Sequence, residues 1–499
     1  MAEFIDQIIK VARQHGYNPV VGDIKKKQEQ WLSWYRGDVN GFHTFKQKIN
    51  GNYKNFERKT LNMPKKICED YRSLIWNERC EIRIESEEGR KAWDKVAAAN
   101  NFDNEFGNLL ELSFATGMGY IVEYIYMNET KINFIPYNNA LPLEYDNGEI
   151  KALLTIDFEQ GQNEYITHLT YHAFEDGLFV VKHEYYVSKD EKKLGQLTPS
   201  KVKDKKLKEE YKFDVKHPFF QVIKPNNANQ HDITSPYGVS VYSTMLDYFM
   251  VADTLFDAMQ NETVNNKTRI IVDGRMLKTK MQTNDETGDV QYINYFDDQD
   301  TAIMAMAYDD EITAGQNTKA VEYFQGELRL DQIKIGLENA VKFIGFRAGL
   351  GKNYYSFDDA NVYQNEKNVI TTNNDTYKTK KKHEMSIGKA IKGIVLGVLQ
   401  SEVVAGNLSE MVDEKDIDII FDDSIAIDDE AIEQKYMTLV SKGFLAPYRL
   451  VMQMLKVSEE EAKQLVAEGT EWMNERNKDY LDIYDEDEIG QDGGEDGQE

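Results

Sequence analysis

Two helical patterns separated by a polar insert occupy residues 235–350, and they decide the fold. The first (235–265) reads SPYGVSVYSTMLDYFMVADTLFDAMQNETVN, and the second (327–350) reads ELRLDQIKIGLENAVKFIGFRAGL. Ser235 followed by Pro236 is typical of a helix start, because serine can cap the helix and proline fits its first turn. We therefore predict two long helices, the first beginning at Pro236, with a small strand-containing module between them.

The first helix has two apolar stripes. Steps of three and four residues place Val241, Met245, Tyr248, Ala252, Leu255 and Met259 on one face, and steps of seven place Tyr242, Phe249 and Phe256 on another. The second helix presents Leu330, Ile333, Leu337, Val341 and Ile344 on one face. An apolar surface this wide needs partners on two sides.

The charge balance excludes a general nucleic-acid binder. The 499 residues hold 59 Lys and Arg against 86 Asp and Glu, for a formal charge of −27, whereas nonspecific DNA binding depends on excess positive charge. The last residues, 479–499, are acidic and poor in apolar side chains, so we expect a disordered tail.

Cysteine usage and hydropathy indicate the environment of the chain. Cys68 and Cys80 cannot build a disulfide framework or a zinc cluster, which favours a reducing compartment. The first 16 residues form an amphipathic helical pattern and not a signal peptide, and the most apolar run, 390–399, is too short to span a bilayer. We expect no membrane partner.

The periodicity predicts a predominantly helical α+β fold. Residues 1–116 are mostly helical, with Trp31 and Trp34 interpreted as core anchors, and residues 120–188 alternate as an antiparallel meander with turns at Asn147-Gly148 and Asp176-Gly177. A long helix is expected from about 366 to 403 and a strand over 416–421. Helices then follow over 428–442, 447–455 and 458–473, the last with a Ser458/Glu461 capping box.

No set of catalytic or metal-binding residues can be named. Gly351-Lys352 lacks the earlier glycine and the following Ser or Thr of a phosphate-binding loop, and His383-Glu384 lacks the second histidine of a zinc protease. His168 and His172 lie about 13 Å apart along one strand face, too far to share a metal. We therefore predict a structural protein without cofactor or metal, and not an enzyme.

Several segments resemble a known family. These are Trp31-x-x-Trp34-Tyr35-x-Gly37, the run LNMPKKICED (61–70), the helix–insert–helix over 235–350, and Tyr377-x-Thr379 with His383 four residues further on. Together they resemble the portal proteins of long-tailed bacteriophages (siphophages) infecting Gram-positive hosts, over nearly the whole chain and in the same order.

The resemblance implies a portal fold that assembles as a ring, with named parts. The implied parts are a wing (1–235), a first stem helix (236–267), a clip insert (268–326), a second stem helix (327–348), a tunnel loop (349–365), a long helix and return strand (366–427), crown helices (428–478) and the acidic tail (479–499).

It also implies roles for particular residues. The tunnel-loop or DNA-facing candidates are Lys352, Asn353, Tyr354, Tyr355, Lys378, Lys380, Lys381 and Lys382. The stem residues expected between subunits are Met245, Phe249, Leu255, Phe256, Ile333, Leu337 and Ile344. The clip candidates for adaptor contact are Tyr292, Tyr295, Phe296 and Met304. The lysines at 378–382 have an equally plain alternative reading, a solvated helix face.

The implied function is a dodecameric ring at one capsid vertex, through which double-stranded DNA is packaged and ejected. Its implied partners are terminase, the head-completion adaptor, and the major capsid and scaffolding proteins. It would reside in the virion, and in the host cytoplasm during assembly. An acidic lumen would repel phosphates and let DNA slide. The alternative is another oligomeric head or connector protein that does not conduct DNA; an enzyme ranks third.

Overall fold

The computed structural model shows an α+β chain, as the sequence predicts. The structure describes residues 2–19, 23–49, 52–161, 164–201, 207–265, 269–273, 278–283, 290–295, 303–306, 321–324, 327–356, 366–422, 436–455 and 457–486. The chain divides into two compact units, residues 1–422 and residues 423–499.

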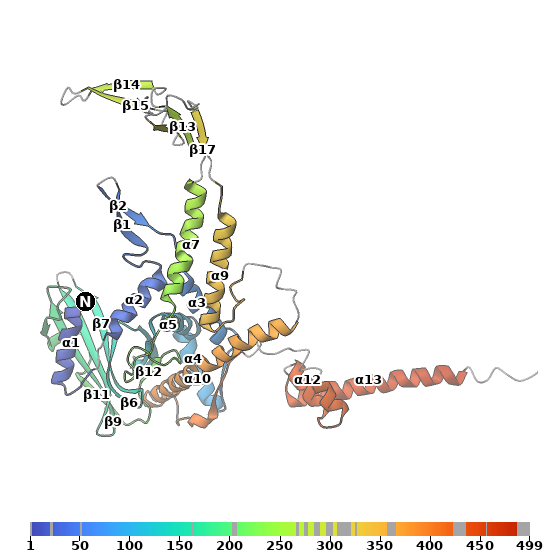
Figure 1. Cartoon of the computed structure of the whole chain (residues 1–499). Coiled ribbons are helices and arrows are strands. Elements are labelled where there is room, and N and C mark those ends of the chain that lie inside the picture. Colours follow the sequence, from blue (N-terminus) through green and yellow to red (C-terminus); the bar gives the residue numbers. More distant parts are fainter. Residues whose placement is uncertain are drawn as a thin grey trace, which may run out of the picture. The chain divides into compact units, whose positions relative to one another are not determined.

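The N-terminal helix α1 (Ala2–Gln14) covers one face of a sheet in the first unit (Figure 1). Its buried side chains Phe4, Ile8 and Ala12 join one hydrophobic cluster with Leu154 and Leu169 of that sheet. The predicted amphipathic helix is therefore confirmed, and burial of its apolar face explains why it is ordered.

Four further helices follow α1, and strands that the sequence pattern did not indicate lie between them. The helices are α2 (Ile24–Arg36), α3 (Met63–Ile75), α4 (Glu87–Ala99) and α5 (Phe102–Thr116), and the strands are β1 (Thr44–Ile49), β2 (Asn52–Glu57) and β3 (Glu81–Ile84). Trp31 and Trp34 are buried, which confirms their interpretation as core anchors. Cys68 lies in α3, whereas Cys80 lies outside any helix; both are free.

The predicted meander forms two separate sheets. One has the order β12-β4-β5, with β4 (Gly119–Tyr126), β5 (Glu129–Pro136) and β12 (Phe220–Ile223). The other has the order β10-β9-β8-β7-β6, with β11 also paired to β9. Its strands are β6 (Ala140–Asp146), β7 (Glu149–Gln160), β8 (Tyr165–Glu175), β9 (Leu178–Ser188), β10 (Gln196–Leu197) and β11 (Glu210–Phe213). The break falls between β5 and β6, which do not pair, and β12 closes the smaller sheet by pairing antiparallel with the outer edge of β4.

Both predicted hairpin turns are confirmed by the backbone. Asn147 and Gly148 have φ of 49° and 77°, and Asp176 and Gly177 have φ of 50° and 83°. Two successive left-handed residues define the tight turn that matches strand twist, and Asn, Asp and Gly adopt this conformation most readily.

The two long helices of the central stretch lie side by side (Figure 1). They are α7 (Leu246–Asn265) and α9 (Leu330–Ala348), and the Leu255 methyl groups lie 3.5 Å from the position a Cβ would take on Gly336. The first helix begins ten residues later than Pro236, so the predicted start is wrong. Tertiary contacts prevent the earlier start, because the Val241 amide donates to the Phe114 carbonyl instead of to a preceding helical turn.

The insert between these helices contains short strands. They are β13 (Arg269–Asp273), β14 (Lys278–Thr283), β15 (Val290–Tyr295), β16 (Ile303–Met306) and β17 (Val321–Phe324). β13 lies between parallel β16 and antiparallel β17, and β14 pairs with β15. This arrangement agrees with the small strand-containing module that the sequence predicts between the two helices.

A 39-residue helix, α10 (Glu366–Val404), contacts α3, α4, β4, β12 and β18 of the first unit. Ile387, Ile391 and Val395 on it are fully buried, so the predicted long helix is a core element. A 3-10 turn, η3 (Glu414–Asp416), leads into β18 (Ile417–Ile420), which returns to pair antiparallel with β3.

The second unit is helical where it is described. Residues 436–441 are helical, followed by α12 (Pro447–Leu455) and α13 (Glu459–Glu486). Ser458 Oγ accepts from the Glu461 amide at 3.3 Å, as expected for the helix cap. α13 continues past the predicted end at 473, so residues 479–486 are helical, contrary to the expected disorder.

Candidate self-association and channel surfaces

The inner side of the α7–α9 pair is packed within its own subunit. Met245 and Phe249 are 1% exposed, and the Phe249 ring lies 5.7 Å from Tyr242 and 6.0 Å from Trp34. On α9, Leu337 and Ile344 are buried as well. These four residues were predicted between subunits; they are instead buried within the single chain, where α7 packs against α9 and Phe249 packs against Trp34 of α2.

The opposite side of the pair leaves apolar side chains in water. Ile335, Phe343 and Phe346 are 59%, 60% and 66% exposed, and their spacing puts them on one side of α9, a surface called here the α9 stripe. Tyr248 and Val251 of α7 are also exposed. Of the predicted interface set, Leu255, Phe256 and Ile333 are partly buried. Clustered exposed apolar side chains mark an interaction surface more often than scattered ones do.

A buried carboxylate on α7 holds the polypeptide on either side of the β1–β2 hairpin. Asp253 is 2% exposed; its Oδ1 accepts from the Leu61 amide at 2.8 Å, and its Oδ2 accepts from Thr60 Oγ1 at 3.0 Å and His43 Nε2 at 2.9 Å. His43 Nδ1 accepts from the Val39 amide, so the ring proton is on Nε2, where it donates to Asp253.

Sequence reasoning missed this Asp253 hub. Its only local signal is an acid placed within an apolar helical pattern, since its hydrogen-bond donors lie 192 to 210 residues away along the chain. Buried carboxylates require such donors, so the hub fixes α7 against the base of the hairpin.

An ion pair joins the helices near the insert. The guanidinium of Arg329 donates to both carboxylate oxygens of Glu262, with Nε at 3.2 Å and Nη2 at 3.0 Å. The two residues lie next to the chain ends that enter and leave the insert. This ion pair with two hydrogen bonds therefore links the segment that enters the insert to the segment that leaves it, in a defined geometry.

The segment after α9 was predicted as a tunnel loop, and its first part is packed against the subunit. The Tyr355 hydroxyl donates to Asp70 Oδ2 at 2.8 Å, and burial together with Asp70 raises the pKa of Tyr355 far above its ordinary value. Thr379 Oγ1 donates to the Gly349 carbonyl at 2.8 Å. Tyr355 thus anchors this segment to α3.

Other members of the predicted loop are more accessible. Lys352 is exposed, Tyr354 is 37% exposed and Asn353 is partly buried. Residues 357–365 of the predicted loop lie outside the described part of the chain.

The predicted lysine cluster separates into buried and exposed members. Lys380 is fully buried; its Nζ lies 2.5 Å from Glu384 Oε1 and donates to the Asp422 carbonyl. Burial removes Lys380 from the channel-facing candidates. Lys378 and Lys382 are exposed, and Lys381 is partly buried beside Glu384, at 2.9 Å.

The clip candidates are placed by their backbone only. Tyr292 and Tyr295 lie on β15 opposite Met281 and Lys278, and Met304 lies on β16 opposite Ile271. Phe296 lies outside the described residues.

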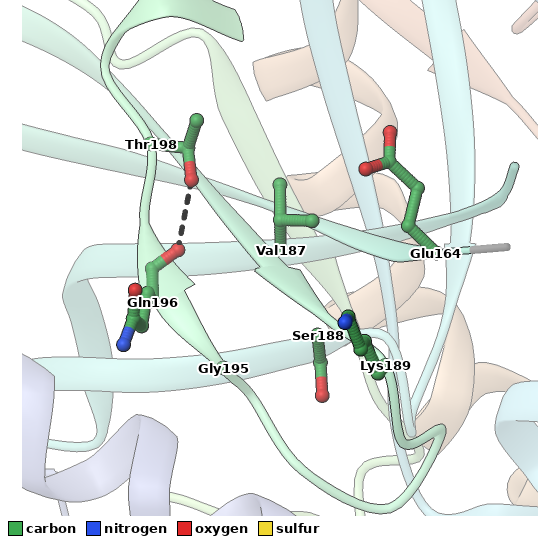
Figure 2. A pocket seen from close by; sticks show the side chains of 7 residues that line it. All are labelled: Glu164, Val187, Ser188, Lys189, Gly195, Gln196 and Thr198. Atoms are coloured by element: carbon green, nitrogen blue, oxygen red, sulfur yellow. Dashed lines mark hydrogen bonds between the residues drawn. The ribbon is translucent and has the colours of Figure 1, made fainter.

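A hollow of about 960 Å³ lies along β9 and β10, and Figure 2 shows its lining side chains, including Glu164, Ser188 and Thr198. Glu164 is paired with Lys201 at 2.7 Å, and these lining residues include no histidine or cysteine to serve as base or nucleophile. In the described part of the chain, no three His, Cys, Asp or Glu side chains are placed to hold a metal ion, and no helix is long and apolar enough to cross a membrane.

Comparison with known proteins gives the family. Residues 23–475 match the family described as phage portal protein, SPP1 Gp6-like. No curated protein matches the chain. Among solved structures, a chain from the neck of a native GTA particle computed with C12 symmetry is 12% identical, with a TM-score of 0.40, and the match covers 89% of this chain and 98% of that one. A chain from the neck of an empty GTA particle computed with C6 symmetry is also 12% identical, with a TM-score of 0.43 and coverage of 90% and 98%. The family match spans both units of the fold, and the chain therefore belongs to the SPP1 Gp6-like phage portal protein family.

Proposed function

We propose that the chain is the portal subunit of a siphophage infecting a Gram-positive host, and that twelve copies form a ring at one capsid vertex. DNA passes through this ring during packaging and ejection. Terminase and the head-completion adaptor dock on it, and the major capsid and scaffolding proteins surround it. Portal proteins are structural proteins, and we assign no catalysis to this one. It resides in the virion, and in the host cytoplasm during assembly.

The α9 stripe is the observation that carries the proposal. Three large apolar side chains on one side of a helix lose water contact when a second copy packs on them, at about 25 cal/mol for each Å² of apolar surface buried. A ring supplies every subunit with two neighbours, so no exposed stripe remains unpaired. A monomeric protein would gain nothing from Ile335, Phe343 and Phe346 in water.

The parts of the fold receive their roles from the family. We assign the stem to α7 and α9, the clip to the strands β13 to β17, the wing to the sheets and N-terminal helices, and the crown to α12 and α13. The exposed lysines Lys352 and Lys378 are our candidates for contact with DNA. The net charge of −27 supports a lumen that repels phosphates elsewhere, so that DNA slides without dwelling.

Native mass of the purified protein tests the ring. Twelve copies of the 57.7-kDa chain give a particle of about 692 kDa, and electron microscopy of that particle would show its symmetry. The double variant Phe343→Ser/Phe346→Ser should shift the mass to that of small species without unfolding the subunit.

A matched control keeps the test specific. Ile233→Ser alters an apolar side chain that is 90% exposed but lies outside the α7–α9 pair, so its rings should persist. A wild-type protein that stays monomeric at physiological salt would refute the proposal. Rings that survive the double variant would remove the α9 stripe from the interface.

A further inference from the structure

A polar cavity lies beside the C-terminal end of α9. Its volume is about 320 Å³, and it is lined from four directions, by α3, the segment 227–244, the end of α9 and α10. Buried Tyr71, Ala348 and His383 contribute to its lining, while exposed Arg347 and Lys382 also border it. The space admits a carboxylate or phosphate group together with several waters.

The cavity is positively charged within an acidic protein. Arg347 and Lys382 line it, and none of its described lining residues is an aspartate or glutamate. The chain as a whole has 86 acidic residues against 59 basic ones, so a lining with two cations and no carboxylate is the reverse of the overall balance. No ion pair holds Arg347 among the described residues, and its guanidinium can donate to an oxyanion with two parallel hydrogen bonds.

Neutral donors complete the lining. His383 Nδ1 accepts from the Asn226 amide at 3.1 Å, which puts the ring proton on Nε2. Burial and, secondarily, Lys382 lower the pKa of His383 to about 3, so the ring remains a neutral donor at physiological pH. The hydroxyls of Ser243 and Thr244 also line the cavity.

Lys382 is held in place by the cavity wall. Its Nζ donates to Asn227 Oδ1 at 2.6 Å, which uses one of three ammonium protons. Partial desolvation lowers the pKa of Lys382, so the charged form has lost part of its hydration, and among the described residues no carboxylate pairs with it. An anion in the cavity would restore that lost stabilisation.

We propose that this cavity is an oxyanion site, filled in the assembled ring by a carboxylate side chain of a neighbouring copy. The occupant is argued from position: Phe346 of the α9 stripe directly precedes Arg347, so a copy packed on the stripe brings its surface to the cavity. The acid-rich surface of the same chain supplies the carboxylate. The choice of occupant rests on the proposed ring, whereas the site itself does not.

Inorganic phosphate probes the site on the dissociated subunit. With the Phe343→Ser/Phe346→Ser variant, replacing chloride by phosphate at equal ionic strength should raise the melting temperature, because an anion that binds only the folded state stabilises it. Adding Arg347→Gln and Lys382→Gln should abolish the increase. A control with Lys10→Gln and Lys54→Gln removes the same charge at two exposed lysines outside the cavity and should keep it.

Ring stability probes the occupant. In the otherwise wild-type chain, Arg347→Gln/Lys382→Gln should lower the salt concentration at which rings dissociate, and Lys10→Gln/Lys54→Gln should not. Absence of phosphate stabilisation overturns the site. If rings of Arg347→Gln/Lys382→Gln are as stable as those of the control variant, the carboxylate occupant is wrong. It is also wrong if those rings stay intact and instead lose affinity for duplex DNA. A wild-type monomer would refute the ring, yet the phosphate measurement on that monomer still decides the site.

Discussion

Removing the Asp253 carboxylate should release the hairpin base from α7. Asp253→Ala leaves the Leu61 amide, the His43 Nε2–H and the Thr60 hydroxyl without their acceptor. A buried donor left unpaired costs about 1–3 kcal/mol, and the hydroxyl can rotate toward another acceptor, so two donors decide the loss. We therefore expect docking of the hairpin base onto α7 to become less favourable by about 3 kcal/mol in free energy.

The loss should be local, since alanine is a better helix former than aspartate and α7 itself gains slightly. Hydrogen exchange of peptides covering residues 38–62 is therefore the assay. When the free energy of local opening falls by about 3 kcal/mol, amide exchange that proceeds through this opening becomes about 100-fold faster. Peptides from the β6–β9 sheet should exchange as in the wild type.

Asp257→Ala is the matched control on the same helix. Among the described residues, Asp257 makes one hydrogen bond to the hairpin base: it accepts from the Lys59 amide at 3.0 Å. This hydrogen bond is exposed to water. Its loss should change exchange only a few-fold, because water replaces the acceptor. Exchange in Asp253→Ala within threefold of the wild type would show that the Asp253 hub does not hold the hairpin.

Two further predictions concern buried charge. Burial lowers the pKa of His172 to about 3 and of His183 to about 4, below the unfolded value of about 6.5, so the unfolded chain binds more protons in acid. Stability should fall as pH drops below about 6.5, by about 2 kcal/mol per histidine at pH 5. Melting temperature measured between pH 7.5 and pH 5 checks this, and His183→Gln should flatten the dependence; an unchanged slope contradicts it. Lys380→Gln should destabilise the fold by about 3 kcal/mol, because it leaves the buried Glu384 carboxylate without one partner, whereas exposed Lys378→Gln should change it by less than about 0.5 kcal/mol. Equal melting curves for the two variants would show that burial of Lys380 does not matter.

Local chemistry in the sequence determined the elements. The apolar periodicity of 327–350 gave α9 within three residues of its start, Asn147-Gly148 and Asp176-Gly177 gave their hairpins, and Ser458 gave the start of α13. These features depend on side chains a few residues apart, which any reader of the chain can see. The family resemblance rests on the same kind of local pattern, and the match over residues 23–475 agrees with it.

Only the tertiary structure decided which surface each pattern serves. Periodicity shows that Met245 and Phe249 share an apolar face, but whether the same subunit or a neighbour covers that face depends on where α2 packs. Lys380 resembles Lys378 in sequence, yet one is buried and the other exposed, because a helix face meets β18 and its following residues only after folding.

The same reason explains the Asp253 hub and the cavity at Arg347. Their partners come from segments up to 210 residues apart for the hub, and from Tyr71 to His383 for the cavity. The conformational preferences of neighbouring residues do not encode these long-range contacts, since the contacts arise when whole helices and strands pack together. The sequence by itself determined the long helices, the two tight hairpins and the family; the packing decided which side chains are buried within the subunit and which remain exposed.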